Sequence, residues 1–309
     1  MIPALLTTIL FALTAVCATQ AAIAFGGTRA NLGRLLIAVV LLGIWAHAYG
    51  LGWSGGEFGR LYLAGAIGFG LGGLCMFQAF PRIGSTLSLL VVECAAAVSS
   101  GVLAWWVLGA ALSPLQVICG LVSIGGVFIG LAPFRLPDVT RPVLVTGALF
   151  AAVASIGQGI SWTLTKSAFI RIQASGGAID PLTAAYQRLL GGVTVALVAV
   201  FLVWILRTLR QGGVVADPLG RQDFVRPPAR AGLWVVANAL AGPVFGVGCM
   251  LWAIREVGNP GIVQAVVATA TLVSVPFSRR LEGRSLRPNY FFGAAMSILG
   301  TAGLLLFGT

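Results

Sequence analysis

Ten runs of about 20 apolar residues follow one another along the chain and leave little sequence outside them. A helix needs about 20 apolar residues to cross the roughly 30 Å hydrocarbon core of a bilayer. Because backbone groups inside a bilayer must pair within their own segment, each run is predicted to be a membrane-spanning helix. The predicted spans are 3–24, 30–49, 60–80, 84–107, 114–132, 142–166, 181–207, 230–254, 259–278 and 287–307.

The composition excludes an ordinary water-soluble protein. Of the 309 residues, 58% are apolar and 9% are charged, whereas a soluble domain has about 25% charged residues. The formal net charge is +11, and in a membrane protein such a surplus orients loops and contacts anionic lipid. No basic run outside the spans is long enough for nucleic acid, so we expect no nucleic-acid partner. We expect a multi-pass protein of a bacterial-type inner cell membrane, in contact with membrane lipid.

The chain resembles itself at a shift of 174 residues, without a gap, from Gly68–Leu131 to Gly242–Leu305. Chance similarity among apolar helices is the alternative, since glycine and alanine are common in all of them. Each copy contains five spans, so the second copy enters the membrane from the opposite side. We therefore predict an all-α membrane protein with ten transmembrane helices, built as two inverted five-helix repeats, 1–135 and 136–309. Inverted repeats are typical of transporters whose substrate site lies near the midplane.

The basic residues are distributed unevenly between the two sets of loops. Loops after odd-numbered spans carry 13 Lys and Arg residues, and loops after even-numbered spans carry four. Positively charged loops usually stay on the cytoplasmic side of the membrane. The distribution therefore favours an orientation with both termini outside.

Two arginines and a pair of short stretches carry a resemblance to a known family. Arg34 and Arg188 lie early in the second and seventh spans, and the stretches before the fifth and tenth spans read LGAALS from Leu108 and LEGRSL from Leu281. In these features the chain resembles the drug/metabolite transporter superfamily, specifically its ten-helix exporters of amino acids and other metabolites. The stretches depart from the Leu-Gly-Glu-Arg-Leu-Thr pattern of that family. The resemblance implies a metabolite exporter and, within the family, most favours aromatic or other hydrophobic amino acids.

Glu93 is the only carboxylate that falls in the middle of a span. A charge at that depth costs several kcal/mol unless it is neutralised, paired or in contact with water. Glu93 is therefore a candidate for binding a substrate ammonium or for exchanging a proton, which makes the proton a candidate coupling ion. The alternative is a protonated structural carboxyl group that is hydrogen-bonded to a neighbouring helix.

Other polar and aromatic residues inside the spans complete the predicted substrate site. Ser155, Gln158 and Trp162 share one face of the sixth span, because they lie at i, i+3 and i+7. Amide side chains offer both donors and acceptors, which suits a zwitterionic ligand, and tryptophan can stack on an apolar or aromatic side chain. The predicted substrate-binding residues are Gln78, Glu93, Ser155, Gln158, Trp162, Tyr186, Trp252 and Gln264.

Several of these residues also have an ordinary structural interpretation. A glutamine inside a span commonly joins two helices through hydrogen bonds. Trp162 and Trp252 lie near the ends of their predicted spans, where the aromatic belt of the membrane interface is the favoured interpretation. The long side chains of Arg34 and Arg188 are expected to extend to lipid headgroups rather than to bind a carboxylate.

The residue inventory favours a carrier over an enzyme, a channel or a scaffold. One histidine and one mid-span carboxylate supply neither a nucleophile–base pair nor a metal site, and no GxxxxGK[ST] motif is present. We therefore predict no catalytic residue, no metal and no other cofactor. The expected function is secondary active or facilitative export of a small-molecule substrate by alternating access, performed by a monomer. A channel, or an intramembrane scaffold or enzyme without a carrier cycle, is the alternative.

Overall fold

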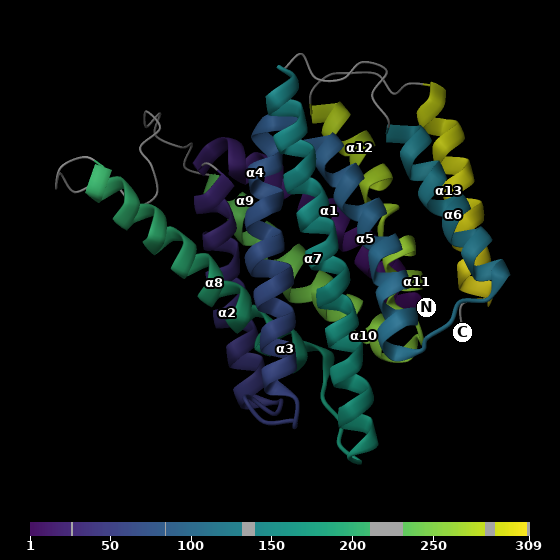
Figure 1. Ribbon diagram of the computed structural model, residues 1–309, viewed down its shortest axis with the longest axis horizontal. Coiled ribbons are helices and arrows are strands. Elements are labelled where there is room, and N and C mark those ends of the chain that lie inside the picture. Colours follow the sequence, from purple (N-terminus) through teal and green to yellow (C-terminus); the bar gives the residue numbers. More distant parts are fainter. Residues whose placement is uncertain (26, 84, 132–139, 211–230, 282–287, 308–309) are drawn as a thin grey trace.

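The computed structural model describes residues 1–25, 27–83, 85–131, 140–210, 231–281 and 288–307. All regular secondary structure in these residues is helical, as Figure 1 shows. Nine helical segments of the described chain are long and apolar enough to cross a membrane, and the first helix is apolar over Ile2–Ala18. The prediction of an all-α, multi-pass membrane protein is therefore confirmed.

The helices correspond closely to the predicted spans. The elements are α1 (Ile2–Phe25), α2 (Gly27–Ala48), α3 (Phe58–Gly65), η1 (Ala66–Gly72), α4 (Gly73–Ile83), α5 (Ser85–Leu108), α6 (Pro114–Leu131), α7 (Arg141–Ala174), α8 (Pro181–Arg210), α9 (Ala231–Ala239), η2 (Leu240–Val244), α10 (Phe245–Glu256), α11 (Pro260–Val267), α12 (Ala270–Leu281) and α13 (Pro288–Phe307). Three of the predicted spans consist of several segments each: α3, η1 and α4 form the third, α9, η2 and α10 the eighth, and α11 and α12 the ninth.

The helix ends follow from local sequence signals. Proline is the first residue of α6, α8, α11 and α13, a position where its missing N–H group and fixed φ suit a helix. Gly109 follows α5 with φ +66°, a left-handed conformation that ends helices and favours glycine. Asn259 caps α11 by accepting a hydrogen bond from the backbone N–H of Gly261 at 2.8 Å. The ends of these helices are therefore determined by local sequence as well as by the length needed to cross a bilayer.

Two spans contain π-helical segments at positions related by the sequence repeat. η1 and η2 begin 174 residues apart, at Ala66 and Leu240, and Pro243 accounts for the irregular hydrogen bonding of η2. In η1 the glycines provide close packing, because a Cβ atom on Gly68 would collide with the side chain of Ser161 on α7. Single π-helical turns occur frequently at functional sites.

The ninth span is interrupted between α11 and α12. Thr269 Oγ1 donates a hydrogen bond to the carbonyl of Val266 at 2.6 Å, and Ser123 of α6 donates to the carbonyl of Ala265 at 3.3 Å. Backbone carbonyls released by a helix break inside a bilayer need such partners. The corresponding segment of the first half lies inside the continuous helix α5.

Helices α6 and α13 pack along their whole length and run antiparallel, side by side in Figure 1. Their contacts run from Gln116 with Phe307 at one end to Gly130 with Gly293 at the other. The two helices also occupy equivalent positions of the sequence repeat, since they begin at Pro114 and Pro288.

The packing between α6 and α13 is reciprocal at the level of single atoms. A Cβ atom added to Gly126 would collide with the backbone nitrogen of Ser297 and the carbonyl oxygen of Gly293. One added to Gly300 would collide with the same two atoms of the residues 174 positions earlier, Ser123 and Cys119. Contacts that occur twice with the partners exchanged are characteristic of a twofold axis between two equivalent elements.

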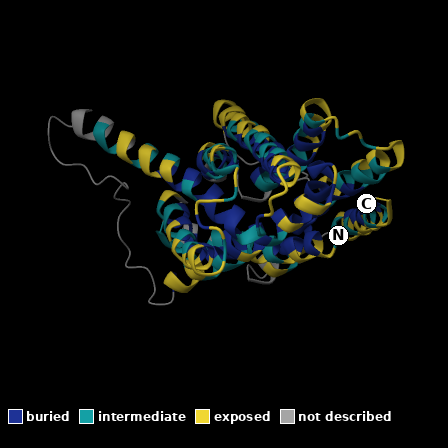
Figure 2. Ribbon diagram, turned by 90° about the horizontal axis from the view of Figure 1, so that it is seen from below, coloured by how far each residue is buried: buried dark blue, intermediate teal, exposed yellow. Residues whose placement is uncertain are grey.

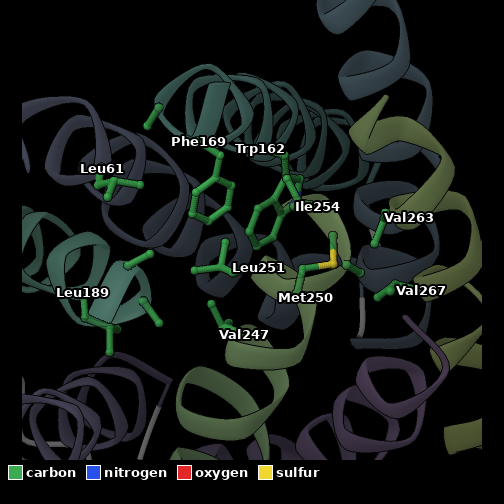
Figure 3. Packing of buried hydrophobic residues seen from close by; sticks show 14 of the residues in the cluster. Leu61, Trp162, Phe169, Leu189, Val247, Met250, Leu251, Ile254, Val263 and Val267 are labelled. Carbon is green, nitrogen blue, oxygen red and sulfur yellow. The ribbon is translucent and has the colours of Figure 1, made fainter. Parts of the chain in front are cut away.

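Buried residues lie in the middle of the bundle and exposed residues around its outside (Figure 2). The largest core cluster includes Trp162 and Phe169 of α7, whose rings point toward Leu251 of α10 (Figure 3). Large apolar side chains such as Leu299, which is 70% exposed, cover the outer surface. A water-soluble protein avoids large exposed apolar surfaces. In a membrane, such a surface is in contact with the apolar tails of the lipids.

Candidate functional site

Arg188 of α8 is completely buried inside the bundle, with 0% of its surface exposed. It lies seven residues after the first residue of α8, Pro181, which places it about 10 Å along the helix. The expectation that its side chain extends to lipid headgroups is wrong, because α3 and η1 pack against α8, and Ser161 and Trp162 of α7 contact the guanidinium group. Arg34 is also buried, with 8% exposed, so the same expectation is wrong for it.

The guanidinium group of Arg188 lies between two aromatic rings. Its Cζ is 4.1 Å from the ring centroid of Trp162 and 5.4 Å from that of Phe69 in η1. Both distances fit cation–π interactions, which gain strength where water is excluded. Nη2 donates to Ser161 Oγ at 2.8 Å, and that hydroxyl donates to the carbonyl of Ala64 at 2.6 Å. A chain of hydrogen bonds therefore joins α8, α7 and α3.

Three buried donor atoms around this guanidinium have no hydrogen-bond partner among the described residues. They are Nε and Nη1 of Arg188 and Nε1 of Trp162. The acidic residues of the described ranges form contacts elsewhere, so none of them neutralises Arg188. Glu57 pairs with Arg60, Glu93 accepts from Gln264, Asp180 accepts from Trp45 and Thr183, and Glu256 accepts from Trp252.

Glu93 and Gln264 meet at a second polar location, between α5 and α11. Gln264 Nε2 donates to Glu93 Oε2 at 2.7 Å, and Gln264 is 2% exposed. Its Oε1 is buried and has no partner in the described chain. Gln264 lies three residues before the end of α11, next to the break in the ninth span. This location therefore offers acceptor atoms, in contrast to the donors around Arg188.

The predicted polar face of the sixth span, in α7, points toward α5 and η1. Ser155 is buried, with its hydroxyl hydrogen-bonded to the carbonyl of Ala152 at 2.8 Å, and its own carbonyl accepts from Ser99 of α5 at 3.2 Å. Gln158 is half-buried, and its Oε1 lies 3.3 Å from where a Cβ atom on Gly68 would be. Trp162, 2% exposed, is in the core and not at the membrane interface that its position in the span suggested.

The other predicted site residues lie apart from these two locations. Tyr186 is 6% exposed, and its hydroxyl accepts from Trp53 Nε1 at 3.1 Å and lies 3.3 Å from His47 Nε2. Gln78 is exposed and accepts from Arg82 at 3.0 Å. Trp252 is 43% exposed and donates to Glu256. The structure thus groups Trp162 with Arg188 and Glu93 with Gln264, and it brings neither Gln78 nor Trp252 to those groups.

An apolar cavity of about 410 Å³ lies between α5, α6, α11 and α13. Its walls include Val102, Trp105, Leu121 and Ile262, and none of the predicted site residues lines it. In the described ranges, no three His, Cys, Asp or Glu side chains gather in a way that could hold a metal ion. The cavity is therefore separate from the polar groups around Arg188 and around Glu93.

Sequence reasoning missed Ser161 and Phe69 as neighbours of Arg188. The sequence does contain a signal for these contacts. Arg188 lies two helical turns inside its predicted span, and a charged group at that depth needs partners on neighbouring helices. The glycines of η1 are a second signal, because they permit the close approach that buries the guanidinium.

Comparison with known proteins supports the transporter class. The model of the EamA-like transporter family, part of the drug/metabolite transporter superfamily, matches residues 1–131. A solved structure titled only as the crystal structure of a protein is similar over 99% of this chain and 97% of that chain, with a TM-score of 0.73 and 16% sequence identity. At this identity the likeness shows the fold alone. No curated protein matches the chain.

Proposed function

We propose that this chain is a secondary transporter of the inner membrane that exports small metabolites by alternating access. The likeness of residues 1–131 to the EamA-like transporter family supports the transporter class. Amino acids with apolar or aromatic side chains are the substrates we propose, on the resemblance of the sequence to metabolite exporters. A proton is the coupling ion that Glu93 would serve, and a monomer is the proposed functional unit.

The observation that carries this proposal is the reciprocal packing of α6 and α13. Two helices at equivalent positions of the sequence repeat run antiparallel and exchange the same contacts. This supports an inverted repeat with halves 1–135 and 136–309, and the matching positions of η1 and η2 support it independently. Inverted repeats permit one half to rock against the other around a site near the midplane.

Within this transporter we propose that the substrate contacts polar and aromatic residues of both halves. Glu93 and Gln264 offer acceptors for an ammonium group, while Trp162 offers a ring that can stack on an apolar side chain. Tyr186 of α8 contacts His47, near the end of α2, and Trp53 in the loop that follows. The proposed substrate-binding residues are Glu93, Ser155, Gln158, Trp162, Tyr186 and Gln264.

Counterflow in liposomes tests the proposal. The purified full chain is reconstituted, the vesicles are loaded with unlabelled L-phenylalanine, and the uptake of labelled L-phenylalanine is followed. A carrier cycle accelerates uptake relative to unloaded vesicles, whereas a channel or a scaffold gives no acceleration. A panel of other amino acids is then added outside as competitors to rank the substrates. No acceleration with any amino acid in the panel would contradict the proposal.

The role of Glu93 is tested in the same vesicles, with and without a proton gradient. We expect Glu93→Gln to lose the response to the gradient, because an amide cannot exchange a proton in the way a carboxyl group does. The double variant Glu93→Gln, Gln116→Glu is the control, because it keeps the number of acidic residues constant and places the carboxylate at a half-buried position of α6 instead. Wild-type export by Glu93→Gln at every pH would contradict a coupling or ammonium-binding role.

A further inference from the structure

We propose that Arg188, with Trp162 above its guanidinium, forms an anion subsite that binds the carboxylate group of the transported substrate. This inference rests on the proposed function, because it assigns a chemical group to the substrate of that transporter. Nothing in the likeness to other transporters assigns a ligand to Arg188. The inference depends on the burial, the contacts and the unused donor atoms of this one side chain.

The subsite offers hydrogen-bond donors only. Nε and Nη1 of Arg188 and Nε1 of Trp162 are buried and have no partner among the described residues. Neither a guanidinium group nor an indole N–H has any acceptor capacity. A ligand that satisfies these three atoms must therefore bring acceptor atoms, and a carboxylate brings two oxygens with about four acceptor positions.

The arrangement of the rings leaves the edge of the guanidinium group for the ligand. Trp162 and Phe69 interact with its delocalised system at 4.1 and 5.4 Å, and Ser161 accepts from one nitrogen only. The N–H groups of arginine project in the plane of the group as a fork that matches the two oxygens of a carboxylate. The aromatic contacts hold that plane in place before the ligand arrives.

Electrostatics favour an anion at this position. A charged side chain inside the membrane is costly unless it is paired, and no acidic residue of the described chain pairs with Arg188. A carboxylate would both neutralise the charge and satisfy the donors. A phosphate group of a lipid is a poor alternative, because Arg188 has 0% exposure and its guanidinium group lies between rings of α7 and η1.

Entry of the ligand requires movement of η1. Phe69 belongs to this π-helical segment and is the half-buried ring next to the guanidinium. η1 packs tightly on α8, where a Cβ atom on Gly70 would collide with the side chain of Val195. Displacing η1 would therefore uncover Arg188 from the side of Phe69. This matches a carrier in which the site is closed in one state and open in another.

The two polar locations differ in the ligand group that each can bind. Acceptor atoms lie at Glu93 and Gln264, and donor atoms lie at Arg188 and Trp162. The substrate class that this chemistry selects is a compound with a free carboxylate.

The experiment compares two compounds that differ only in this group. L-phenylalanine and L-phenylalaninamide share the ring and the ammonium group, but the amide lacks the carboxylate. Their binding to the full chain in detergent is measured by the shift in the unfolding temperature, and chloride at the same concentration is the third probe. We expect L-phenylalanine to bind about 10- to 100-fold more tightly than its amide, the range that corresponds to charge-assisted hydrogen bonds.

Variants of Arg188 test whether this side chain causes the preference for L-phenylalanine over its amide. Arg188→Gln should lose the preference, Arg188→Lys should keep only part of it because the fork is absent, and Arg34→Gln, the matched control, should retain it. If Arg188→Gln does not fold, the two compounds still decide the question on the wild-type protein. Equal binding of the two compounds, protection by chloride equal to that by L-phenylalanine, no binding of either compound, or loss of the preference in Arg34→Gln would each overturn the subsite.

The two proposals fail in different ways. Because binding is measured without transport, a clear carboxylate preference with no counterflow would overturn the proposed function and leave the anion subsite standing. Counterflow that L-phenylalaninamide drives as well as L-phenylalanine would overturn the subsite and leave the transporter standing.

Discussion

Arg34 and Arg188 occupy the same place in identical Arg-Leu-Leu sequences of the two halves, yet their surroundings differ. Arg34 donates from Nε to Asn31, one turn earlier on its own helix, at 2.9 Å. Arg188 has alanine at the matching position, Ala185, and donates instead to Ser161 of another helix. The first half therefore supplies a partner for its arginine locally, and the second half leaves two of the nitrogens of Arg188 unused. Two arginines in identical local sequences thus have different partners.

α5 and α11, which also correspond in the repeat, differ in their polar residues as well. Glu93 in α5 corresponds to Val267 in the repeat, and the continuous helix around Glu93 corresponds to the break between α11 and α12. Glu93 binds Gln264 across the two halves. The contacts between α6 and α13 are shared by the halves, whereas the buried polar contacts of Arg188 and of Glu93 are not.

The largest expected difference between the halves concerns transport. Arg188→Met should lower the counterflow rate about 100-fold, because several charge-assisted hydrogen bonds to the substrate are lost. The same variant should keep or raise its free energy of unfolding, since a buried, unpaired charge is removed. Arg34→Met should transport within about threefold of the wild type. Counterflow assays and denaturant unfolding measure the two quantities, and equal loss of transport in both variants would remove the distinction between the arginines.

The second prediction concerns the contacts that the halves share. Gly126→Ala and Gly300→Ala should each lower the free energy of unfolding by about 1–3 kcal/mol, because each added methyl group collides with backbone atoms of the partner helix. The two losses should be equal, since the contacts are reciprocal. Gly125→Ala is the control, because a Cβ atom there has nothing within 4 Å among the described residues, and alanine favours helix by about 1 kcal/mol. Clearly unequal losses would contradict a twofold relation.

The third prediction concerns the hydrogen bond that joins unlike residues of the halves. A double-mutant cycle of Glu93→Leu and Gln264→Leu should give a coupling energy of about 1 kcal/mol in the free energy of unfolding, the usual size for such bonds inside membranes. A coupling near zero would mean that this contact is replaced by others when it is broken. The cycle needs only unfolding measurements, so it is independent of any substrate.

The smallest effects are expected at an exposed position where the two halves again agree. Gln78 and Trp252 correspond in the repeat, and each bonds to the residue four places later, Arg82 and Glu256. Pairs of this kind on a helix surface contribute about 0.2–0.5 kcal/mol. Gln78→Ala and Trp252→Phe should therefore change the free energy of unfolding by less than about 0.5 kcal/mol and the counterflow rate by less than twofold. A tenfold loss of transport in either variant would place that residue in the substrate path.

Much of the fold could be predicted from the sequence because the bilayer imposes simple requirements. A span must be apolar, about 20 residues long and helical, and proline and glycine mark its ends, as at Pro114 and Gly109. The break between α11 and α12 could not be predicted, because the Thr and Ser residues that satisfy its carbonyls are equally compatible with a continuous helix.

The site was harder to predict than the spans. Glu93 and Gln264 could be selected as polar residues at depth, but their contact depends on how α5 packs against α11. An arginine two helical turns inside a span can extend to lipid or turn inward, and its position alone does not identify the helices that it contacts. The side chain of Arg188 is held inside the bundle by contacts with η1 and α7, which are separate segments of the sequence.

The pairing of α6 with α13 also sets an order on biogenesis. Each helix enters the membrane as it is synthesised, and α6 does so well before its main partner exists. Until α13 emerges, the small residues on that side of α6, including Gly126 and Gly130, face lipid with nothing to fill the space above them. Packing of α6 is thus completed only after α13 has been synthesised, and a chain that ends between the two helices leaves these glycines without their partner helix.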